Sequence, residues 1–202
     1  MLPCKMEELI IGYSIKMWGN IPERAIARLD TKIPGDSYFP DKYQGILNAN
    51  KMFSDLTKDT EIVKSDIKDG DLKGNIILTG MVDEYFNYCF GELPYIGMRV
   101  VHCKSETRLP VAVVNYPDID IPFIRITDYN QFGFSGGWLG IEFPDKNIKS
   151  YPVITDESID LFKKYEDLAK QKGIVLLGRL GRYQYVDMDE CIEQALELTK
   201  DY

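Results

Sequence analysis

Histidine is nearly absent from this sequence of 202 residues, in which His102 is the single example. Its four cysteines, Cys4, Cys89, Cys103 and Cys191, are scattered and form no C-x-x-C pair. A zinc site would have to be assembled from isolated residues, and free thiols in a reducing compartment are the simpler interpretation. We therefore predict no metal site.

Long hydrophobic runs are also lacking. The apolar stretches are far shorter than the roughly 20 residues of a membrane helix, and the opening MLPCKMEEL has no apolar signal-peptide core. Basic residues are the minority, with 24 against 32 acidic ones and a net charge of -8. Because nucleic acids and anionic lipids require a basic face, we expect a cytoplasmic protein that binds neither nucleic acid nor membrane. A local basic pocket for a small anion is still compatible with this charge.

Several motifs that mark common active sites are missing. No two glycines are separated by one residue, so the G-x-G-x-x-G dinucleotide fingerprint does not occur, and neither does the P-loop pattern. The sequence also has no H-E-x-x-H and no G-x-S-x-G. Catalysis by a histidine base, a serine triad or a bound zinc ion is therefore unsupported.

Hydrophobic periodicity predicts an α+β fold with a central antiparallel sheet. Apolar residues at three- and four-residue spacing predict a helix over 6–18, and Pro22 favours the start of a second helix that ends before Pro34. β-Branched and aromatic runs bounded by turn residues predict the strands. The expected strands are 61–65, 75–80, 93–103, 111–116, 121–129 and 137–143, with a short helix or turn at 82–91.

The last fifty residues change to a helix-strand-helix pattern. A helix is predicted from about Thr155 to Gly173, followed by an apolar strand over 174–178. Asp187 and Glu190 have the spacing of a capping box, which indicates the start of a final helix.

Arg125 is the most unusual residue of the predicted strands, because Ile, Phe and Pro surround it in VVNYPDIDIPFIRITDYNQF (113–132). Either its guanidinium reaches water along the apolar stem, or a negative group approaches it. A period of two places five residues on one face of this half-buried strand. They are Ile121, Phe123, Arg125, Thr127 and Tyr129.

Thirteen tyrosines is a high count, and several of them lie in loops beside basic residues. A phenol offers a flat face for stacking and a hydroxyl donor, and nearby Arg or Lys can hold phosphates by charge-assisted hydrogen bonds. This combination suits a nucleotide diphosphate. Packing on half-buried strands is the ordinary alternative, and composition alone favours it.

The sequence resembles the UDP-galactopyranose mutases over nearly its whole length, matching about the second half of a family member. The stretches that carry the similarity are GYSIKMWG (12–19), YFPDKYQG (38–45), ILTGMVDEYFNYCFGELPY (77–95), VVNYPDIDIPFIRI (113–126), SYPV (150–153) and LGRLGRYQYVDM (177–188). The resemblance implies interconversion of UDP-galactopyranose and UDP-galactofuranose, a precursor of cell-surface polysaccharides, with reduced FAD as nucleophile. It also implies three parts: a remnant of a helical domain (1–33), an antiparallel-sheet substrate domain (34–150) and a C-terminal segment of the flavin lobe (151–202).

The resemblance further implies roles for individual residues. Arg125 corresponds to the catalytic arginine that faces the diphosphate, where it would stabilise the charge that develops as UDP leaves. The implied substrate-binding residues are Tyr13, Ser14, Trp18, Lys32, Tyr38, Asn115, Tyr151 and Tyr185. The implied cofactor-binding residues, toward FAD, are Arg179, Asp187 and Met188. Without the resemblance, Tyr13 and Trp18 would be assigned to the core by their helical spacing.

Some positions depart from the family pattern. Cys89 and Ile96 stand where the family has arginines, and Lys32 replaces an arginine, which keeps the charge but loses the two-pronged guanidinium. The family's flavin lobe with its glycine fingerprint has no counterpart in this sequence. We therefore expect this chain to be the UDP-sugar-binding half of a mutase. On its own, the chain should bind FAD weakly or not at all. The alternatives are a non-catalytic nucleotide-sugar-binding module, or one half of a split flavoenzyme with a separate FAD-binding polypeptide, and a homo-oligomer is also compatible.

Overall fold

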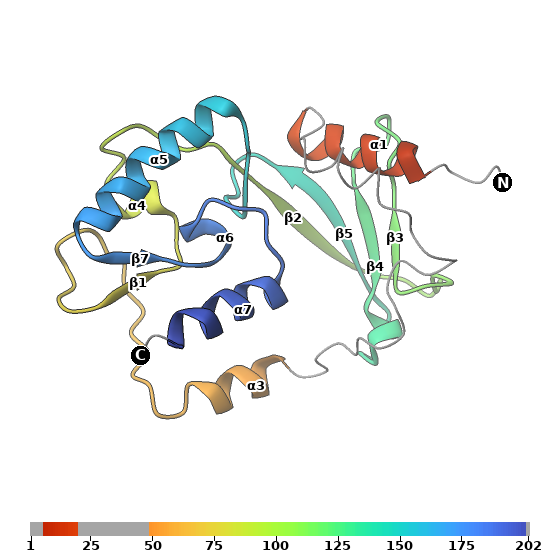
Figure 1. Ribbon diagram of the computed structural model, residues 1–202. Helices are drawn as coiled ribbons and strands as arrows, with labels where there is room; N and C mark the ends of the chain where they lie inside the picture. The colour runs from red at the N-terminus through yellow and green to blue at the C-terminus, as the bar shows by residue number, and fades with distance from the viewer. Residues whose placement is uncertain (1–5, 20–48, 201–202) are drawn as a thin grey trace.

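A computed structural model describes residues 6–19 and 49–200 of the chain. It contains a five-stranded antiparallel sheet, a two-stranded parallel sheet and helices around them (Figure 1). The predicted α+β class with a central antiparallel sheet is confirmed. The second predicted helix, which follows Pro22, lies outside the described residues. None of the described helices combines the length and the hydropathy that crossing a membrane requires.

The helical elements are α1 (Met6–Trp18), α3 (Ala49–Leu56), α4 (Val82–Tyr85), η1 (Tyr129–Phe132, a 3-10 helix), α5 (Asp156–Gln171), α6 (Gly178–Gly181) and α7 (Met188–Thr199). The strands are β1 (Ile76–Leu78), β2 (Tyr95–Lys104), β3 (Val113–Asn115), β4 (Arg125–Asp128), β5 (Trp138–Asp145), β6 (Tyr151–Pro152) and β7 (Ile174–Leu176). The predicted C-terminal helix-strand-helix pattern corresponds to α5, β7 and α7.

The antiparallel sheet has the strand order β3-β4-β5-β2-β6. Its longest ladder joins β2 to β5, from Gly97 opposite Asp145 to Lys104 opposite Trp138. The strand predicted over 121–129 is shorter than expected and begins at Arg125. Pro122 has no backbone N–H to donate to a ladder, and the Ile121 N–H bonds to Asp118 in a turn, so these residues stay outside the sheet.

One strand prediction is confirmed in a second sheet, and another needs correction. The segment 75–80 contributes β1, which pairs in parallel with β7 in a sheet separate from the central one. The predicted strand over 61–65 is wrong, because these residues have no regular structure and their side chains are exposed. β-Branched residues favour a strand only where a neighbouring strand accepts their backbone hydrogen bonds, and no described strand pairs with this segment.

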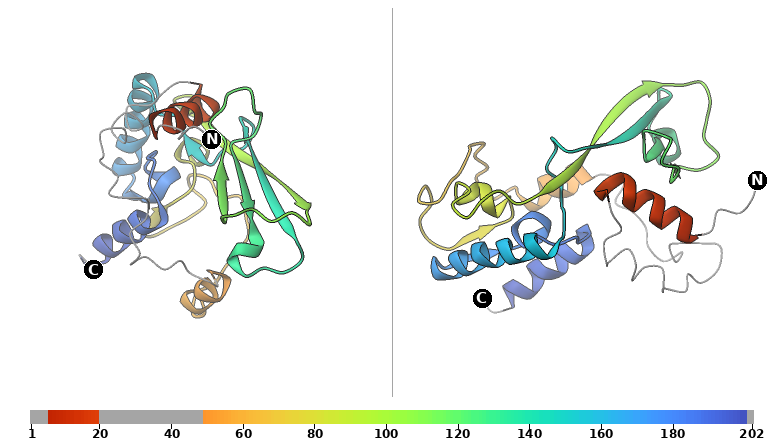
Figure 2. Two further views of the ribbon diagram at one scale, coloured as in Figure 1. Left: turned by 90° about the vertical axis from the view of Figure 1, so that its right-hand side faces the viewer. Right: turned by 90° about the horizontal axis from the view of Figure 1, so that it is seen from above.

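Two hydrophobic cores meet at the start of β2. Tyr95 belongs to the first core, with Tyr165 of α5 among its members, and Ile96 belongs to the second, with Met17 of α1 and Ile124. Successive strand residues point to opposite faces, so β2 joins the two cores through one pair of adjacent residues. α1 lies against one face of the antiparallel sheet, beside the second core (Figure 2).

α1 is fixed to the loop that precedes β4. A Cβ atom on Gly12 would lie 2.2 Å from the Pro117 carbonyl oxygen, so only glycine permits this approach. Four residues later, Lys16 Nζ donates hydrogen bonds to the carbonyl oxygens of Tyr116 (2.6 Å) and Phe123 (2.8 Å). Burial of its ammonium group lowers the pKa of Lys16. These contacts set the distance between α1 and the strand that carries Arg125.

Replacing Gly12 with alanine tests this contact. Alanine is the better helix former by about 1 kcal/mol, but its methyl group would overlap the Pro117 backbone, and overpacking costs about 1–3 kcal/mol. Because the overlap at 2.2 Å is with backbone atoms, the cost should lie in the upper part of this range. After the gain in helix propensity, we expect Gly12→Ala to lower the free energy of unfolding by about 1–2 kcal/mol, measured by urea unfolding. Ile15→Ala, an exposed position of the same helix, should change it by less than about 0.5 kcal/mol. Equal stability of Gly12→Ala and the native chain would contradict the contact.

Candidate functional site

Four of the predicted site residues form one aromatic cluster. Tyr13 and Trp18 come from α1, Tyr151 from β6 and Tyr185 from the loop before α7. The ring centroids of Tyr13 and Trp18, and of Trp18 and Tyr185, are 5.8 Å apart in edge-to-face geometry. Tyr151 and Tyr185 stack at 5.6 Å. All four side chains are half-buried, so each keeps part of its ring or polar tip at the surface.

Strand pairing explains how Tyr151 reaches this cluster. Tyr151 lies opposite Ile96 in the β2–β6 ladder, and cross-strand neighbours share a face of the sheet. Tyr151 is therefore on the same side as α1. The loop that carries Tyr185 is anchored by Tyr183, whose single hydroxyl proton is shared between the carbonyl oxygens of Pro94 (2.7 Å) and Val153 (2.9 Å).

Arg179 connects the cluster to the start of α7. Its Cζ atom lies 4.5 Å from the ring centroid of Tyr151 and 5.4 Å from that of Tyr185, within cation–π range. Its Nε and one Nη donate to the Val186 carbonyl oxygen at 2.9 and 2.7 Å, and a terminal nitrogen lies 3.6 Å from Asp187 Oδ1. These contacts hold the guanidinium plane beside two phenol rings and one carboxylate.

Arg125 lies in a row of cross-strand neighbours, with Asn115 opposite it on β3 and Glu142 opposite it on β5. Arg125 Nε donates to Asn115 Oδ1 at 3.0 Å, and a terminal nitrogen lies 3.6 Å from Glu142 Oε2. The Arg125 side chain is 32% exposed and that of Glu142 is 13% exposed. Among the described residues, the negative group that approaches Arg125 is therefore Glu142.

Sequence reasoning did not single out Glu142. Its Oε1 accepts a hydrogen bond from the Thr127 hydroxyl at 3.4 Å, whereas its buried Oε2 has no hydrogen-bond partner among the residues that the structure describes. The available signal was a lone carboxylate in an otherwise apolar predicted strand, GWLGIEF (137–143). The carboxylate orients Arg125 without saturating its donors, so the guanidinium can still bind another anion.

Electrostatics link the aromatic cluster to this row. Burial is the main reason that the pKa of Tyr13 is raised; Tyr185 raises it further, Arg125 opposes the rise, and Tyr151 and Glu142 add to it. Tyr13 is therefore within electrostatic reach of the aromatic cluster and of the row that contains Arg125. Its hydroxyl stays protonated and able to donate a hydrogen bond at neutral pH. The cluster and the row form one candidate site, with two guanidinium groups among several phenols.

The structure does not bring the remaining predicted residues into the cluster or the row, or does not describe them. Ser14 is 1% exposed on α1, so its hydroxyl does not reach the surface of the site. Met188 is 75% exposed on α7. Lys32 and Tyr38 lie outside the described residues. The structure thus brings eight of the predicted residues together, and their roles stay predictions: Tyr13, Trp18, Asn115, Arg125, Tyr151, Arg179, Tyr185 and Asp187.

The positions that depart from the family pattern have distinct environments. Ile96 is buried in the second core beside Met17. The resemblance implies an arginine at this position, but in this chain the side chain is part of the apolar packing under α1. Cys89 is exposed in a turn that follows two residues with left-handed backbone, Asn87 (φ 51°) and Tyr88 (φ 55°).

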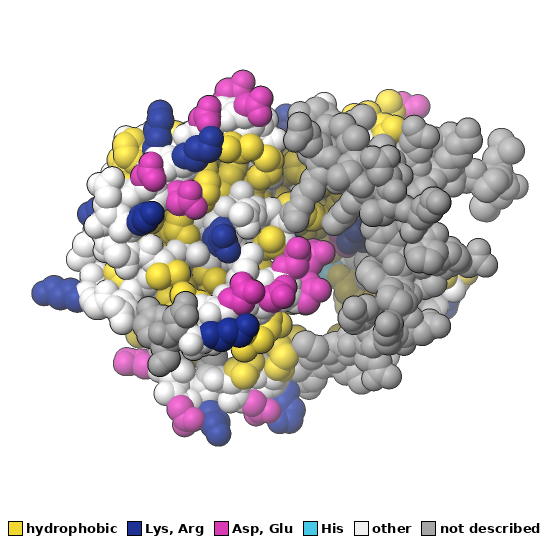
Figure 3. All heavy atoms as spheres, in the orientation of Figure 1, with side chains coloured by type: hydrophobic (Ala, Val, Ile, Leu, Met, Phe, Trp, Pro, Cys, Tyr) yellow, Lys and Arg dark blue, Asp and Glu magenta, His cyan; other side chains and the backbone are white. Residues whose placement is uncertain are grey.

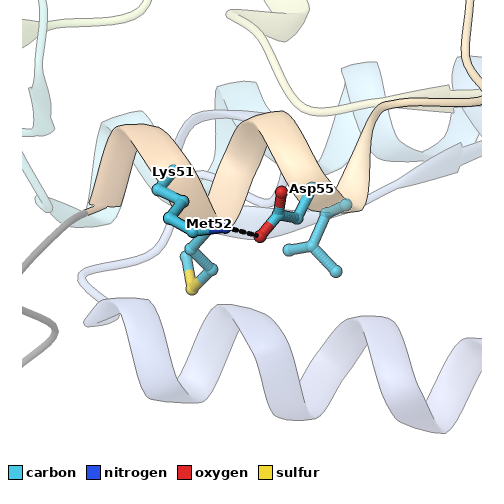
Figure 4. Close-up of a pocket in the computed structure, with 4 residues that line it drawn as sticks. Lys51, Met52 and Asp55 are labelled. Atoms are coloured by element: carbon cyan, nitrogen blue, oxygen red, sulfur yellow. Dashed lines mark hydrogen bonds and ion pairs between the residues drawn. The ribbon is translucent and has the colours of Figure 1, made fainter.

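A surface hollow of about 450 Å³ lies at α3, where Lys51 and Asp55 form an ion pair beside Met52 (Figure 4). This hollow shares no residue with the candidate site. The candidate site is identified by the side chains that converge there, and not by a hollow. Across residues 6–19 and 49–200, no three His, Cys, Asp or Glu side chains gather as a metal ion would require.

Comparison with known proteins gives a consistent set of relatives. A family model described as UDP-galactopyranose mutase matches residues 8–185. The chain is 29% identical to the dTDP-fucopyranose mutase of Escherichia coli, over 95% of this chain and 58% of that protein. It is 29% identical to a Klebsiella pneumoniae protein named "Probable UDP-galactopyranose mutase", over 97% of this chain and 57% of the relative. The UDP-galactopyranose mutase of Mycoplasma genitalium is also 29% identical, over 89% of this chain and 54% of that protein. The chain thus spans little more than half the length of these relatives.

A double-mutant cycle tests the pairing of Arg125 with Glu142. Arg125→Met leaves a half-buried carboxylate without its cation, and we expect a loss of about 1–2 kcal/mol in unfolding free energy, below the range of fully buried pairs. Adding Glu142→Gln should restore most of this loss, because the uncompensated charge disappears. The same cycle on the more exposed pair Arg99–Asp145, 3.9 Å apart, should give a coupling energy below about 0.5 kcal/mol. Failure of Glu142→Gln to rescue Arg125→Met would show that the two side chains are not coupled.

Proposed function

The chain belongs to the UDP-galactopyranose mutase family, and from this premise we propose that it forms the nucleotide-sugar-binding half of a mutase active site. The reaction would interconvert the pyranose and furanose forms of a UDP-linked sugar, which supplies precursors for cell-surface polysaccharides. The observation that carries this proposal is the convergence of Arg125 with the phenols of Tyr13, Tyr151 and Tyr185 on one side of the sheet.

Arg125 has the position that departure of a nucleoside diphosphate requires. When the bond between the anomeric carbon and the diphosphate oxygen breaks, negative charge accumulates on the phosphate oxygens. A guanidinium already oriented by Asn115 and Glu142 needs little reorganisation to stabilise that charge, so its effect is larger in the transition state than in the ground state. Glu142 acts here as a positioning residue.

The aromatic cluster supplies the remaining contacts to the nucleotide. The hydroxyls of Tyr151 and Tyr185 can donate hydrogen bonds to phosphate oxygens, and Arg179 behind them adds positive charge. Tyr13 and Trp18 offer ring faces at the α1 end of the cluster, where the uracil base would stack. Ser14 has no direct role in this arrangement, because its hydroxyl is buried.

The described residues fit only one edge of the FAD that family chemistry requires. When bound, reduced flavin would supply the nucleophile for the anomeric carbon. Arg179, Asp187 and the exposed Met188 would contact its ring near the N-terminal end of α7, where a helix dipole favours negative charge on the reduced ring. No described group fits the FAD pyrophosphate, since the glycine fingerprint does not occur in the sequence.

A non-catalytic nucleotide-sugar-binding module is the second candidate function. It is favoured by Ile96, whose side chain is part of the second core where the resemblance implies an arginine. Titration of the purified chain with UDP and with FAD, in separate experiments, tests what these two candidate functions require. We expect calorimetric binding of UDP without FAD, and no flavin absorbance retained by the chain alone. Absence of UDP binding would overturn both candidate functions, and tight FAD binding by the chain alone would exclude the non-catalytic module.

The double variant Arg125→Met with Glu142→Gln measures the contribution of Arg125 to binding. Because the pair is removed together, the variant should fold, and any loss of affinity reports on the site. Hydrogen bonds to charged groups contribute about 1.5–3 kcal/mol, so we expect UDP to bind about 10- to 100-fold more weakly by calorimetry. Arg99→Met removes a cation from the opposite face of the same sheet and should leave UDP affinity unchanged. Unchanged affinity in the double variant would exclude Arg125 from the site.

A further inference from the structure

Lys16 of α1 contacts both ends of the loop that joins β3 to β4. Its Nζ donates a hydrogen bond to the carbonyl oxygen of Tyr116 at 2.6 Å, and Tyr116 directly follows Asn115. It also donates to the carbonyl oxygen of Phe123 at 2.8 Å, two residues before Arg125. One ammonium group of α1 therefore holds the loop just beyond the point where Asn115 and Arg125 pair.

The residue directly before Arg125 is also held by its neighbours. The Ile124 N–H donates to the Glu142 carbonyl oxygen at 2.9 Å, and the Ile124 carbonyl oxygen accepts the Tyr116 N–H at 2.9 Å. The Ile124 side chain is fully buried and belongs to the second core together with Met17, the residue of α1 that follows Lys16. The backbone that leads into Arg125 is therefore fixed to α1 by a polar contact and by an apolar one.

Packing alone does not require a lysine at this position. Burial lowers the pKa of Lys16, and Asp118 opposes this effect, so the ammonium group is less well hydrated than in water. An apolar side chain of similar length would fill the same space without this desolvation. A charged donor instead forms short and directional hydrogen bonds, which define the positions of two carbonyl oxygens more sharply than apolar contacts do. The lysine is therefore suited to positioning the loop.

The position of Arg125 matters because acidic side chains border the candidate site. Glu142 lies 3.6 Å from the guanidinium. Acidic side chains also gather over the region of α7 (Figure 3), where Asp189 and Glu190 lie in the first turn. These carboxylates would repel a diphosphate wherever Arg125 lies, whereas the attraction from its guanidinium requires short distances. A small displacement of Arg125 would therefore weaken the binding of a diphosphate.

We propose that Lys16 is a positioning residue for Arg125. It holds the loop between β3 and β4 against α1, and this contact sets the spacing between the guanidinium and the rings of Tyr13 and Trp18 on the same helix. The proposal rests on the function proposed above, in which the base lies at these rings and the diphosphate at Arg125. Only a ligand that occupies both places depends on this spacing. Lys16 itself needs no contact with the ligand, because its ammonium group donates to carbonyl oxygens of the protein.

The affinities for two ligands test this role. Uridine can occupy only the base end of the site, whereas UDP occupies both ends. We expect Lys16→Met to bind UDP about 3- to 10-fold more weakly by calorimetry, because the guanidinium is still present but is held less well. The affinity for uridine, measured by NMR titration, should be unchanged. Lys172→Met removes a lysine that pairs with Asp69 at 2.7 Å beside α5, and it should leave both affinities unchanged. Equal losses for uridine and UDP, or no loss for UDP, would overturn the proposal.

The dependence on Arg125 is tested in a second background. With Arg125→Met and Glu142→Gln already in place, the addition of Lys16→Met should cause no further loss of UDP affinity, because the group that Lys16 positions is gone. In the native background, Lys16→Gln keeps a donor for one of the two carbonyl oxygens and should lose less affinity than Lys16→Met. A loss in the double-variant background as large as in the native chain would show that Lys16 acts independently of Arg125.

A measurement without ligand separates this inference from the proposed function. The Arg125 Nε–H donates to Asn115 Oδ1 at 3.0 Å, and its exchange with solvent can be followed by NMR. We expect Lys16→Met to accelerate this exchange at least about threefold while the far-UV circular dichroism stays native. If the exchange is accelerated but the native chain does not bind UDP, the positioning role is right and the proposed function is wrong. If UDP binds and the exchange is unchanged, Lys16 does not position Arg125.

Discussion

The arrangement of the site depends on two adjacent residues at the start of β2. Tyr95 and Ile96 point in opposite directions, and each is buried in a different core. The Tyr95 hydroxyl donates to Asp83 Oδ1 at 3.3 Å, and burial, with Asp83 as the next cause, raises the pKa of this phenol, so it remains a donor. Because Tyr151 pairs with Ile96, fixing this register also fixes the aromatic cluster relative to α1. A shift of one residue would turn Tyr151 to the wrong face.

The charge of the site is locally balanced in an acidic chain. The net charge of -8 would repel a nucleoside diphosphate at long range, so the binding proposed above has to come from short contacts. Arg125 and Arg179 each lie 3.6 Å from a carboxylate oxygen, of Glu142 and Asp187 respectively. At this separation the carboxylates orient the guanidinium groups without closing short hydrogen bonds, which leaves donors for phosphate oxygens. The balance favours a ligand that offers several acceptors at once over a single small anion.

Local signals predicted much of the fold, and long-range pairing marks where prediction failed. The helix expected from Thr155 begins there because Thr155 Oγ1 accepts the Ser158 N–H, a contact within one turn. The pairing of β1 with β7 joins residues about a hundred positions apart, and nothing in either run indicates its partner. The segment 61–65 has strand composition, yet a strand also needs a neighbour. Glu142 was missed for the same reason, since only the β4–β5 register places it opposite Arg125.

The two halves of the molecule differ in how completely they are packed. Around the candidate site, Gly12, Lys16 and Ile96 hold α1 against the sheet, and the site residues are held by neighbours within the chain. Around β1 and α7, Ile77 and Met188 are exposed, and β1 and β7 pair only with each other among the described residues. Under the proposed function, a preorganised cation for the leaving diphosphate would accelerate nothing until a nucleophile is held at the anomeric carbon. Substrate recognition and catalysis would therefore depend on different parts of the structure, and recognition would need only the well-packed part.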